Sequence, residues 1–264
     1  MSCQSINNRY TAQIVDGGAL LPETRLLLSQ WERHISIEDN LRRAQVENTL
    51  GKASRNRVSR ILDAFRRRYT QDPDLLHALV LLAKADALQV TLDRILCFCA
   101  LQDDPLLTDT ALCLLVPAYR AGRSDITVAE VADWLGQQCS AGRTAGRWSP
   151  STITRLASGL LSTLRDFGLL EGTVKKQMCP VFMPAEACAL MSFFLYRDLS
   201  SGELVVNNQA WEAFYMTPFD VERSLIEASG LKLLQYNAAG RVIRIDYPAQ
   251  SAEEYARVIT QRKT

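Results

Sequence analysis

The chain has little of what metal sites and enzyme active sites require. It contains only two histidines, His34 and His77, and its seven cysteines include no CxxC pair. A structural zinc site needs His or Cys ligands at characteristic spacings, so we expect no metal centre. Also missing are a GxxxxGK[ST] phosphate loop, a GxSxG nucleophile elbow and an HExxH helix. Because no positioned acid, base or nucleophile can be assigned, the sequence favours a protein that is not an enzyme and uses no cofactor.

The sequence also lacks a membrane-spanning run and a signal peptide. No apolar stretch approaches the roughly 18 residues that a transmembrane helix needs. The N-terminus has neither the basic start nor the apolar middle of a secretory signal. The cysteines are scattered, mostly among apolar neighbours, as in LCFCA at residues 96–100. We therefore expect a cytoplasmic protein without membrane insertion, whose cysteines are free buried thiols in a reducing compartment.

The whole-chain net charge of +1 conceals a strong local excess of basic residues. Residues 41–70 hold nine basic and two acidic side chains, a balance of +7, whereas residues 71–139 have a balance of −6. Eight of the nine basic residues are arginine, which favours bidentate contact with phosphate. Charge sorted in this way indicates a polyanion as partner. From this segment the predicted DNA-contacting residues are Arg42, Arg43, Lys52, Arg55, Arg57, Arg60, Arg67 and Arg68.

Helical periodicity dominates the first two thirds of the chain and predicts an N-terminal helical bundle. The helix expected over residues 54–69 has an apolar arc of about 100° on a helical wheel, made of Val58, Ile61, Leu62, Phe65 and Tyr69. The neighbouring arc would present guanidinium groups and holds Arg57, Arg60, Arg67 and Arg68. The predicted helices of the bundle are residues 22–34, 37–48, 54–69, 74–87, 91–100 and 108–120.

Residues 125–184 change character and predict a winged helix-turn-helix. An amphipathic helix over residues 126–138 is followed by a loop, residues 139–148, that contains two glycines. Ser149 as N-cap and Pro150 at the first helical position start a second helix, which runs to Phe167 and ends at Gly168. A small β-hairpin over residues 169–183 follows.

The second helix of this segment has an outer face of small polar and basic side chains. Hydroxyl and arginine side chains can reach phosphates and base edges in a DNA major groove. Residues 142–177 carry a charge balance of +4, and two lysines occupy the hairpin tip. The predicted DNA contacts of this segment are Arg143, Arg147, Ser151, Arg155, Lys175 and Lys176. A winged helix that docks on protein is the alternative, because fold alone does not decide function.

The remaining residues predict a smaller α+β unit. Helices over residues 186–199, 207–215 and 218–229 precede two strands, residues 231–236 and 241–247. The last of these helices is mostly acidic on its polar face and would repel phosphate, so we interpret the unit as a winged-helix-like structural element or protein contact. The predicted fold is mainly α, with a helical domain at residues 1–121, a winged helix-turn-helix at 122–184 and a small α+β domain at 185–264.

Three stretches of the chain carry a resemblance to a known family. Residues 10–25, YTAQIVDGGALLPETR, form a glycine-rich apolar opening that ends in Glu-x-Arg. The basic helix at 54–69 follows, and AGRSDITVAEVADWL at 121–135 leads into the predicted helix-turn-helix. Over residues 9–247 the chain resembles the BrxA family, small components of BREX bacteriophage-exclusion systems. The resemblance implies a helical N-terminal part, winged-helix elements, double-stranded DNA binding, and action alongside a methyltransferase, an ATPase and a phosphatase-like protein.

The leading hypothesis is a non-enzymatic, double-stranded DNA-binding component of an antiviral defence system of the BREX type, which binds mainly through phosphate contacts. A second hypothesis is a protein-docking adaptor that assembles the defence complex, and a third is an RNA-binding regulator, because basic helical surfaces also hold RNA. The sequence leaves open whether the two basic segments, residues 41–70 and 142–177, share one face.

Overall fold

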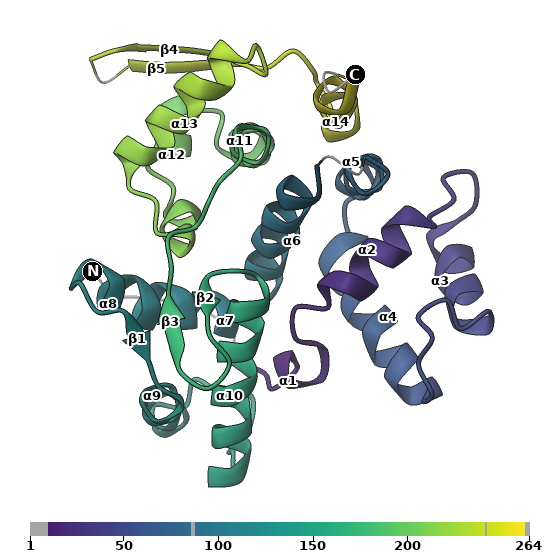
Figure 1. The fold of residues 1–264 in the computed structure, drawn as a ribbon, viewed down its shortest axis with the longest axis vertical. Coiled ribbons are helices and arrows are strands. Elements are labelled where there is room, and N and C mark those ends of the chain that lie inside the picture. The colour runs from purple at the N-terminus through teal and green to yellow at the C-terminus, as the bar shows by residue number, and fades with distance from the viewer. Residues whose placement is uncertain (1–9, 86–87, 241, 262–264) are drawn as a thin grey trace. The chain divides into compact units, whose positions relative to one another are not determined.

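The computed structural model describes residues 10–85, 88–240 and 242–261, which form a mainly helical protein with two small antiparallel sheets (Figure 1). The predicted fold class is confirmed at this level. The chain divides into two compact units, and each combines segments that are distant in sequence. Of the described residues, unit 1 contains those in Met1–Leu20, Ala100–Val181 and Glu212–Tyr215, and unit 2 contains those in Leu21–Cys99, Phe182–Trp211 and Met216–Thr264. The predicted domain boundaries at residues 121 and 184 stay predictions.

The first part of unit 2 consists of helices close to those predicted. They are α2 (Leu21–Ser29), α3 (Ile37–Val46), α4 (Arg55–Tyr69), α5 (Pro73–Ala83) and α6 (Gln89–Asp103), the last of which continues into unit 1. Side chains cap α3 and α4: the N–H of Asp39 donates to Ser36 Oγ at 3.0 Å, and that of Arg57 to Ser54 Oγ at 3.4 Å. The apolar arc predicted for α4 is buried throughout.

The C-terminal part of unit 2 adds α11 (Ala185–Leu199), α12 (Gly202–Val206), the first half of the 3₁₀ helix η3 (Gln209–Phe214) and α13 (Pro218–Gly230). A two-stranded hairpin follows, with β4 (Gln235–Ala239) antiparallel to β5 (Val242–Asp246), and the predicted start of its second strand at residue 241 lies outside the described residues. The α-helix expected over 207–215 was wrong, because α12 ends at Val206 and the helical residues of this stretch, Gln209–Phe214, form the 3₁₀ helix η3.

A helix that the sequence did not predict, α14 (Ala252–Gln261), closes unit 2 and packs on α5. Its N-terminus is capped from α5: the Asp74 carboxylate accepts from the N–H of Ala252 at 2.6 Å and from that of Glu253 at 2.9 Å. The sequence did contain one local signal for this helix, because Ser251 directly precedes it and accepts from the Glu254 N–H at 3.1 Å. The cap from Asp74 could not be indicated locally, because Asp74 lies 178 residues before Ala252.

Unit 1 contains a short helix α1 (Ile14–Gly17), followed along the chain by α7 (Pro105–Thr110), the π-helical turn η2 (Ala111–Leu115) and α8 (Val116–Arg120). The single helix expected over residues 108–120 is therefore interrupted. A proline inside a helix lacks a donor and crowds the carbonyl four residues before it, and the wider turn ahead of Pro117, closed by a bond from the Val116 N–H to the Ala111 carbonyl, relieves that crowding.

The rest of unit 1 is β1 (Asp125–Ile126), α9 (Val128–Ser140), α10 (Pro150–Asp166), β2 (Leu170–Glu171) and β3 (Lys176–Met178). The strands form one antiparallel sheet in the order β1-β3-β2, in which Asp125 pairs with Gln177 and Leu170 with Met178. β1 was missed because two residues are too few to show an alternating pattern. It occupies the start of the helix expected over residues 126–138, and α9 begins after Thr127, which forms a capping box with Glu130.

None of the helices in the described part of the chain has both the length and the apolarity that a bilayer crossing requires. The cysteine prediction needs one correction. Cys97, Cys99 and Cys188 are buried free thiols, and Cys139 and Cys179 are free and half-buried. Cys113, however, is disulfide-bonded, so the expectation that every cysteine is free was wrong. Burial raises the pKa of the Cys97 and Cys99 thiols, which keeps them protonated.

Candidate nucleic-acid interface

The central element of the candidate interface is α10. It begins at the residues that the sequence predicted. Ser149 caps it, accepting from the Thr152 N–H at 3.2 Å, and Pro150 occupies the first turn. Its inner face is buried and includes Leu156, Ala157, Leu160, Leu161 and Leu164. α9 and α1 pack against α10. Because one side is locked into the core, the opposite side is held in a fixed orientation toward solvent.

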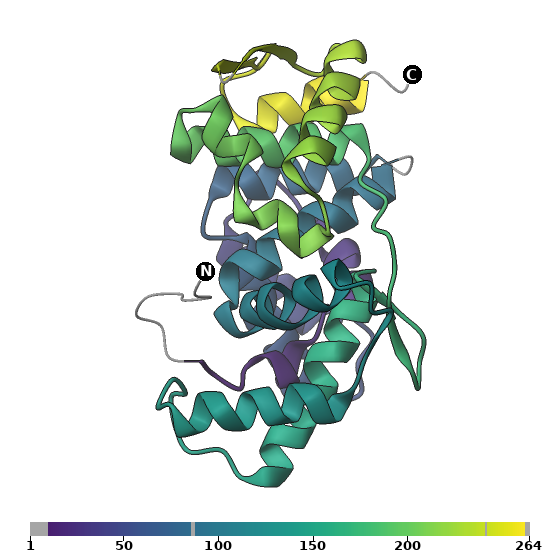
Figure 2. The same cartoon turned by 90° about the vertical axis from the view of Figure 1, so that its left-hand side faces the viewer.

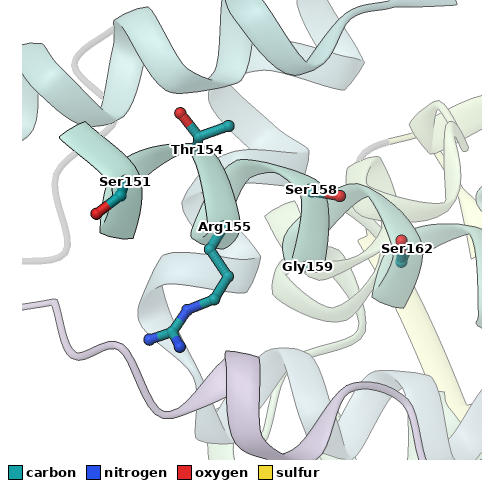
Figure 3. Close-up of a pocket in the computed structure, with 6 residues that line it drawn as sticks. All are labelled: Ser151, Thr154, Arg155, Ser158, Gly159 and Ser162. Carbon is teal, nitrogen blue, oxygen red and sulfur yellow. The ribbon is translucent and has the colours of Figure 1, made fainter.

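The outer face of α10 forms a shallow groove of about 650 Å³, lined by Ser151, Thr154, Arg155, Ser158, Gly159 and Ser162 (Figure 3). Figure 3 shows the Arg155 guanidinium extending well away from the helix, whereas the hydroxyls of Ser151 and Thr154 stay close to it. Arg155 is exposed and forms no ion pair with any residue that the structure describes. The face therefore combines low side-chain bulk with one long, uncompensated cation.

The β2–β3 hairpin follows α10 in the sequence and has a tight turn at its tip. Gly172 has φ +84°, and a Cβ there would lie 2.1 Å from the Lys175 carbonyl oxygen, so only glycine fits. At the tip Val174 is 94% exposed and Lys175 is exposed. Val174 was not among the residues that the sequence singled out. An apolar residue in a four-residue turn was the signal that could have indicated this exposed side chain.

Lys176 does not occupy the position predicted for it. Its side chain is buried, and Nζ donates to the Gly172 carbonyl at 3.1 Å and to the Thr173 carbonyl at 2.5 Å. Burial lowers the pKa of this ammonium, and the nearby Arg165 acts in the same direction. The prediction that Lys176 contacts phosphate is therefore corrected: its ammonium fastens the turn that carries Lys175.

The loop between α9 and α10 carries the two other basic residues predicted in this unit. Arg143 and Arg147 are both exposed. Arg143 Nη1 donates to Gln138 Oε1 at 3.3 Å, and its backbone N–H donates to the Gln138 carbonyl at 3.0 Å. Gly142, with φ +70°, makes the turn that leaves α9. Unit 1 thus brings Arg143, Arg147, Ser151, Arg155 and Lys175 to one segment of structure, the helix pair with its loop and hairpin.

The basic residues of 41–70 all lie in unit 2, and several are neutralised there. Arg42 pairs with Asp39, Arg43 with Glu32, and Lys52 Nζ lies 2.9 Å from Glu23 Oε1. Burial alone would raise the pKa of the Glu23 carboxyl, but the hydrogen bond from Lys52 and the charges of Lys52 and Arg57 outweigh it and hold this pKa below its usual range. Such pairs reduce the charge that these residues can offer to a polyanion.

α4 presents fewer arginines than the helical wheel indicated. Arg55, Arg57 and Arg60 are exposed and Arg67 is half-buried, in accordance with the predicted arc. Arg68 is only 5% exposed and belongs to the buried side of the helix, so its predicted role as a DNA contact is corrected. A 100° wheel places Arg68 at the border of the apolar arc, where packing rather than residue type decides burial.

The described residues contain no group of three or more His, Cys, Asp or Glu side chains placed to hold a metal ion.

Comparison with known proteins shows a shared fold and a family. A crystal structure of an uncharacterized protein from Magnetospirillum magneticum matches with a TM-score of 0.58 at 20% sequence identity, over 78% of this chain and 98% of that one, and so shares the fold. A search of curated proteins finds no match. The sequence pattern of the BrxA family matches residues 8–193, which is well over half of the chain, and this protein therefore belongs to the BrxA family.

Proposed function

We propose that this protein is a non-enzymatic component of a BREX-type bacteriophage-exclusion system that binds double-stranded DNA, mainly through phosphates. Membership of the BrxA family supports the BREX context. The main support for DNA binding is the outer face of α10. There Arg155 lies among serine, threonine and glycine residues, on a helix whose other side is buried.

The order of elements in unit 1 supports a winged helix-turn-helix. A short strand, two helices joined by a loop, and a hairpin follow each other, and the sheet order is β1-β3-β2. Winged helices have this order, and their second helix docks in or along the major groove. Small side chains on α10 would let the backbone approach closely, while Ser151 and Arg155 bind phosphates or base edges.

Phosphate contacts from Arg143 and Arg147 before α10, and from Lys175 at the hairpin tip, would flank the helix on both sides. Arg55, Arg57, Arg60 and Arg67 of α4 supply a second basic surface in unit 2. Arg42, Arg43 and Lys52 contribute less in this proposal, because each already has an acidic partner. In the defence system a methyltransferase, an ATPase and a phosphatase-like protein would be the partners.

A salt titration of duplex binding tests this proposal. With about six phosphates neutralised, the logarithm of the association constant should fall with the logarithm of salt concentration at a slope near −5. Fluorescence polarisation of a labelled random duplex measures it, with structured RNA of equal charge as competitor. An interaction that is undetectable at low salt, or that does not respond to salt, would remove DNA binding. Stronger competition by RNA would favour the RNA-binding alternative.

One observation favours an adaptor role as a second candidate function. On α13 of unit 2, Phe219 is 72% and Ile226 is 58% exposed, one on each side of Arg223 on the solvent face. Exposed large apolar side chains at helical spacing are typical of protein contacts. Co-purification of the BREX partners after nuclease treatment should be lost in a Phe219→Ser, Ile226→Ser variant if α13 docks a partner, and retained in the wild type.

A further inference from the structure

The N-terminal stretch that carries the family resemblance has a structural place beside the proposed DNA-binding loop. Tyr10 is only 4% exposed and forms a parallel β-bridge with Thr144 in the loop between α9 and α10. The Tyr10 N–H donates to the Arg143 carbonyl at 2.8 Å, and the Ala145 N–H donates to the Tyr10 carbonyl at 2.8 Å. These two bonds tie the chain at residue 10 to the loop on both sides of Thr144.

The Tyr10 side chain is fixed as firmly as its backbone. Its hydroxyl donates to Asp109 Oδ2 at 2.5 Å, and its ring centroid lies 6.0 Å from that of Trp134 on α9. Burial raises the pKa of this phenol, and the hydrogen bond to Asp109 adds to the effect, so that the hydroxyl remains a donor at neutral pH. Tyr10 therefore connects the loop to two elements of unit 1, α7 and α9.

The residues that follow Tyr10 contact α10 itself. α1 packs on α10, and Ile14 is almost fully buried. Figures 1 and 2 both show this short helix beside α10. Gly18 has φ +65°, and a Cβ there would lie 3.8 Å from Thr163 Oγ1 of α10. Residues 10–20 thus lie against both the loop and the helix that carry the proposed DNA contacts.

We propose that residues 10–20 form a brace that holds the α9–α10 loop in the conformation that presents Arg143 and Arg147 to DNA phosphates, with Tyr10 as its positioning residue. This inference rests on the proposed function. The loop contains Gly142 and Gly146 and has few bonds of its own, chiefly those from the Arg143 N–H to the Gln138 carbonyl and from Thr144 Oγ1 to the Gly146 carbonyl. A loop ordered in advance loses less conformational entropy when it binds, so the brace strengthens binding without touching DNA.

The test compares the wild type with Tyr10→Phe, which keeps the ring against Trp134 and the backbone bridge but removes the bond to Asp109. We expect duplex affinity to fall about five-fold, the usual effect of one lost hydrogen bond. Amide hydrogen exchange of a peptide that spans residues 141–148 should accelerate by a similar factor, while exchange in α13 stays unchanged. Equal affinity and equal loop exchange in the two proteins would overturn the brace.

A double-mutant cycle with Arg147→Gln separates positioning from general stability. If Tyr10 positions Arg147, the loss of affinity caused by Arg147→Gln should be clearly smaller in the Tyr10→Phe background than in the wild type, because the arginine there is already misplaced. Strictly additive losses would mean that Tyr10 acts only on stability, and would overturn the inference.

Two further variants complete the experiment. Tyr255→Phe removes a comparable buried bond, from its hydroxyl to the Leu233 carbonyl at 2.9 Å in unit 2, and should leave duplex affinity unchanged. Asp109→Asn keeps an acceptor for Tyr10 and should bind nearly as well as the wild type. Asp109→Ala removes that acceptor and serves as the test variant if Tyr10→Phe does not fold, with the same expected loss of affinity. A wild type that binds no duplex would overturn the proposed function, whereas a binding wild type with an unaffected Tyr10→Phe overturns the brace alone.

Discussion

At the residue scale, neighbouring side chains of one type have different surroundings and therefore different roles. Lys175 is exposed at the hairpin tip, whereas the Lys176 ammonium is buried and bonded to two carbonyls. On α4, Arg67 is half-buried whereas Arg68 is buried. Residue type and charge alone could identify the basic segments, but the side on which each cation lies depends on contacts between elements, which the sequence does not display.

The two lysines of the hairpin provide a matched pair of variants. Lys176→Met should lower the free energy of unfolding by about 1–3 kcal/mol, because the Gly172 and Thr173 carbonyls lose their charged donor. Lys175→Met should leave stability unchanged and reduce the salt slope of duplex binding by about 1, as expected for one phosphate contact. Urea unfolding and fluorescence polarisation measure the two effects. The same loss of stability in both variants would contradict the assignment.

Arg155 is the residue on which the proposed interface depends most. Arg155→Ala removes the long cation that lines the α10 groove and should weaken duplex binding about ten-fold or more, with the melting temperature unchanged, since the residue is exposed. Arg165→Ala on the same helix is the control. Arg165 is paired with Asp166 at 2.6 Å, so its loss should change affinity by less than about two-fold. Equal effects of the two substitutions would point to non-specific electrostatics.

At the element scale, local signals predicted helices well wherever the signals lay next to the helix. Ser149 caps α10 as predicted, and Ser36, Ser54 and Thr217 likewise cap the helices that directly follow them. The failures are η2, β1 and α14. β1 depends on pairing with β3, and α14 depends in part on a cap supplied by Asp74 from another helix, so neither is fully visible in a window of sequence. For η2 and α14 local signals existed in Pro117 and in Ser251, which accepts from the Glu254 N–H.

The cap on α14 can be tested directly. Asp74→Ala should lower the free energy of unfolding by about 1–2 kcal/mol, because the N–H groups of Ala252 and Glu253 lose their acceptor. The loss also removes a contact with Arg197, whose Nη1 lies 3.6 Å from Asp74 Oδ2. Asp63→Ala, an exposed acidic residue on α4, is the matched control and should stay within about 0.5 kcal/mol of the wild type. Urea unfolding at neutral pH measures both, and equal stabilities would show that α14 does not need this cap.

At the scale of the whole molecule, basic and acidic residues nearly cancel in the net charge of +1, but they are concentrated in different segments of the chain. The exposed arginines of α4 belong to unit 2, and Arg147, Arg155 and Lys175 belong to unit 1. The sequence could locate both basic segments, because charge is a property of residues. It could not indicate that N-terminal residues 10–20 fold with residues 100–181, because that association depends on packing between distant segments.

The two basic surfaces predict a specific pattern of salt dependence. Reversing the charge of Arg57, Arg60 and Arg67 to Glu, or that of Arg147, Arg155 and Lys175, removes about three phosphate contacts in either case. If both surfaces bind one duplex, each triple variant should reduce the salt slope from near −5 to about −3. A third variant with Glu in place of Arg223, Lys232 and Arg244 changes the net charge equally at exposed positions outside the proposed interface, and should keep the wild-type slope. A wild-type slope for the α4 variant would confine DNA binding to unit 1, and equal losses in all three would mean that only total charge matters.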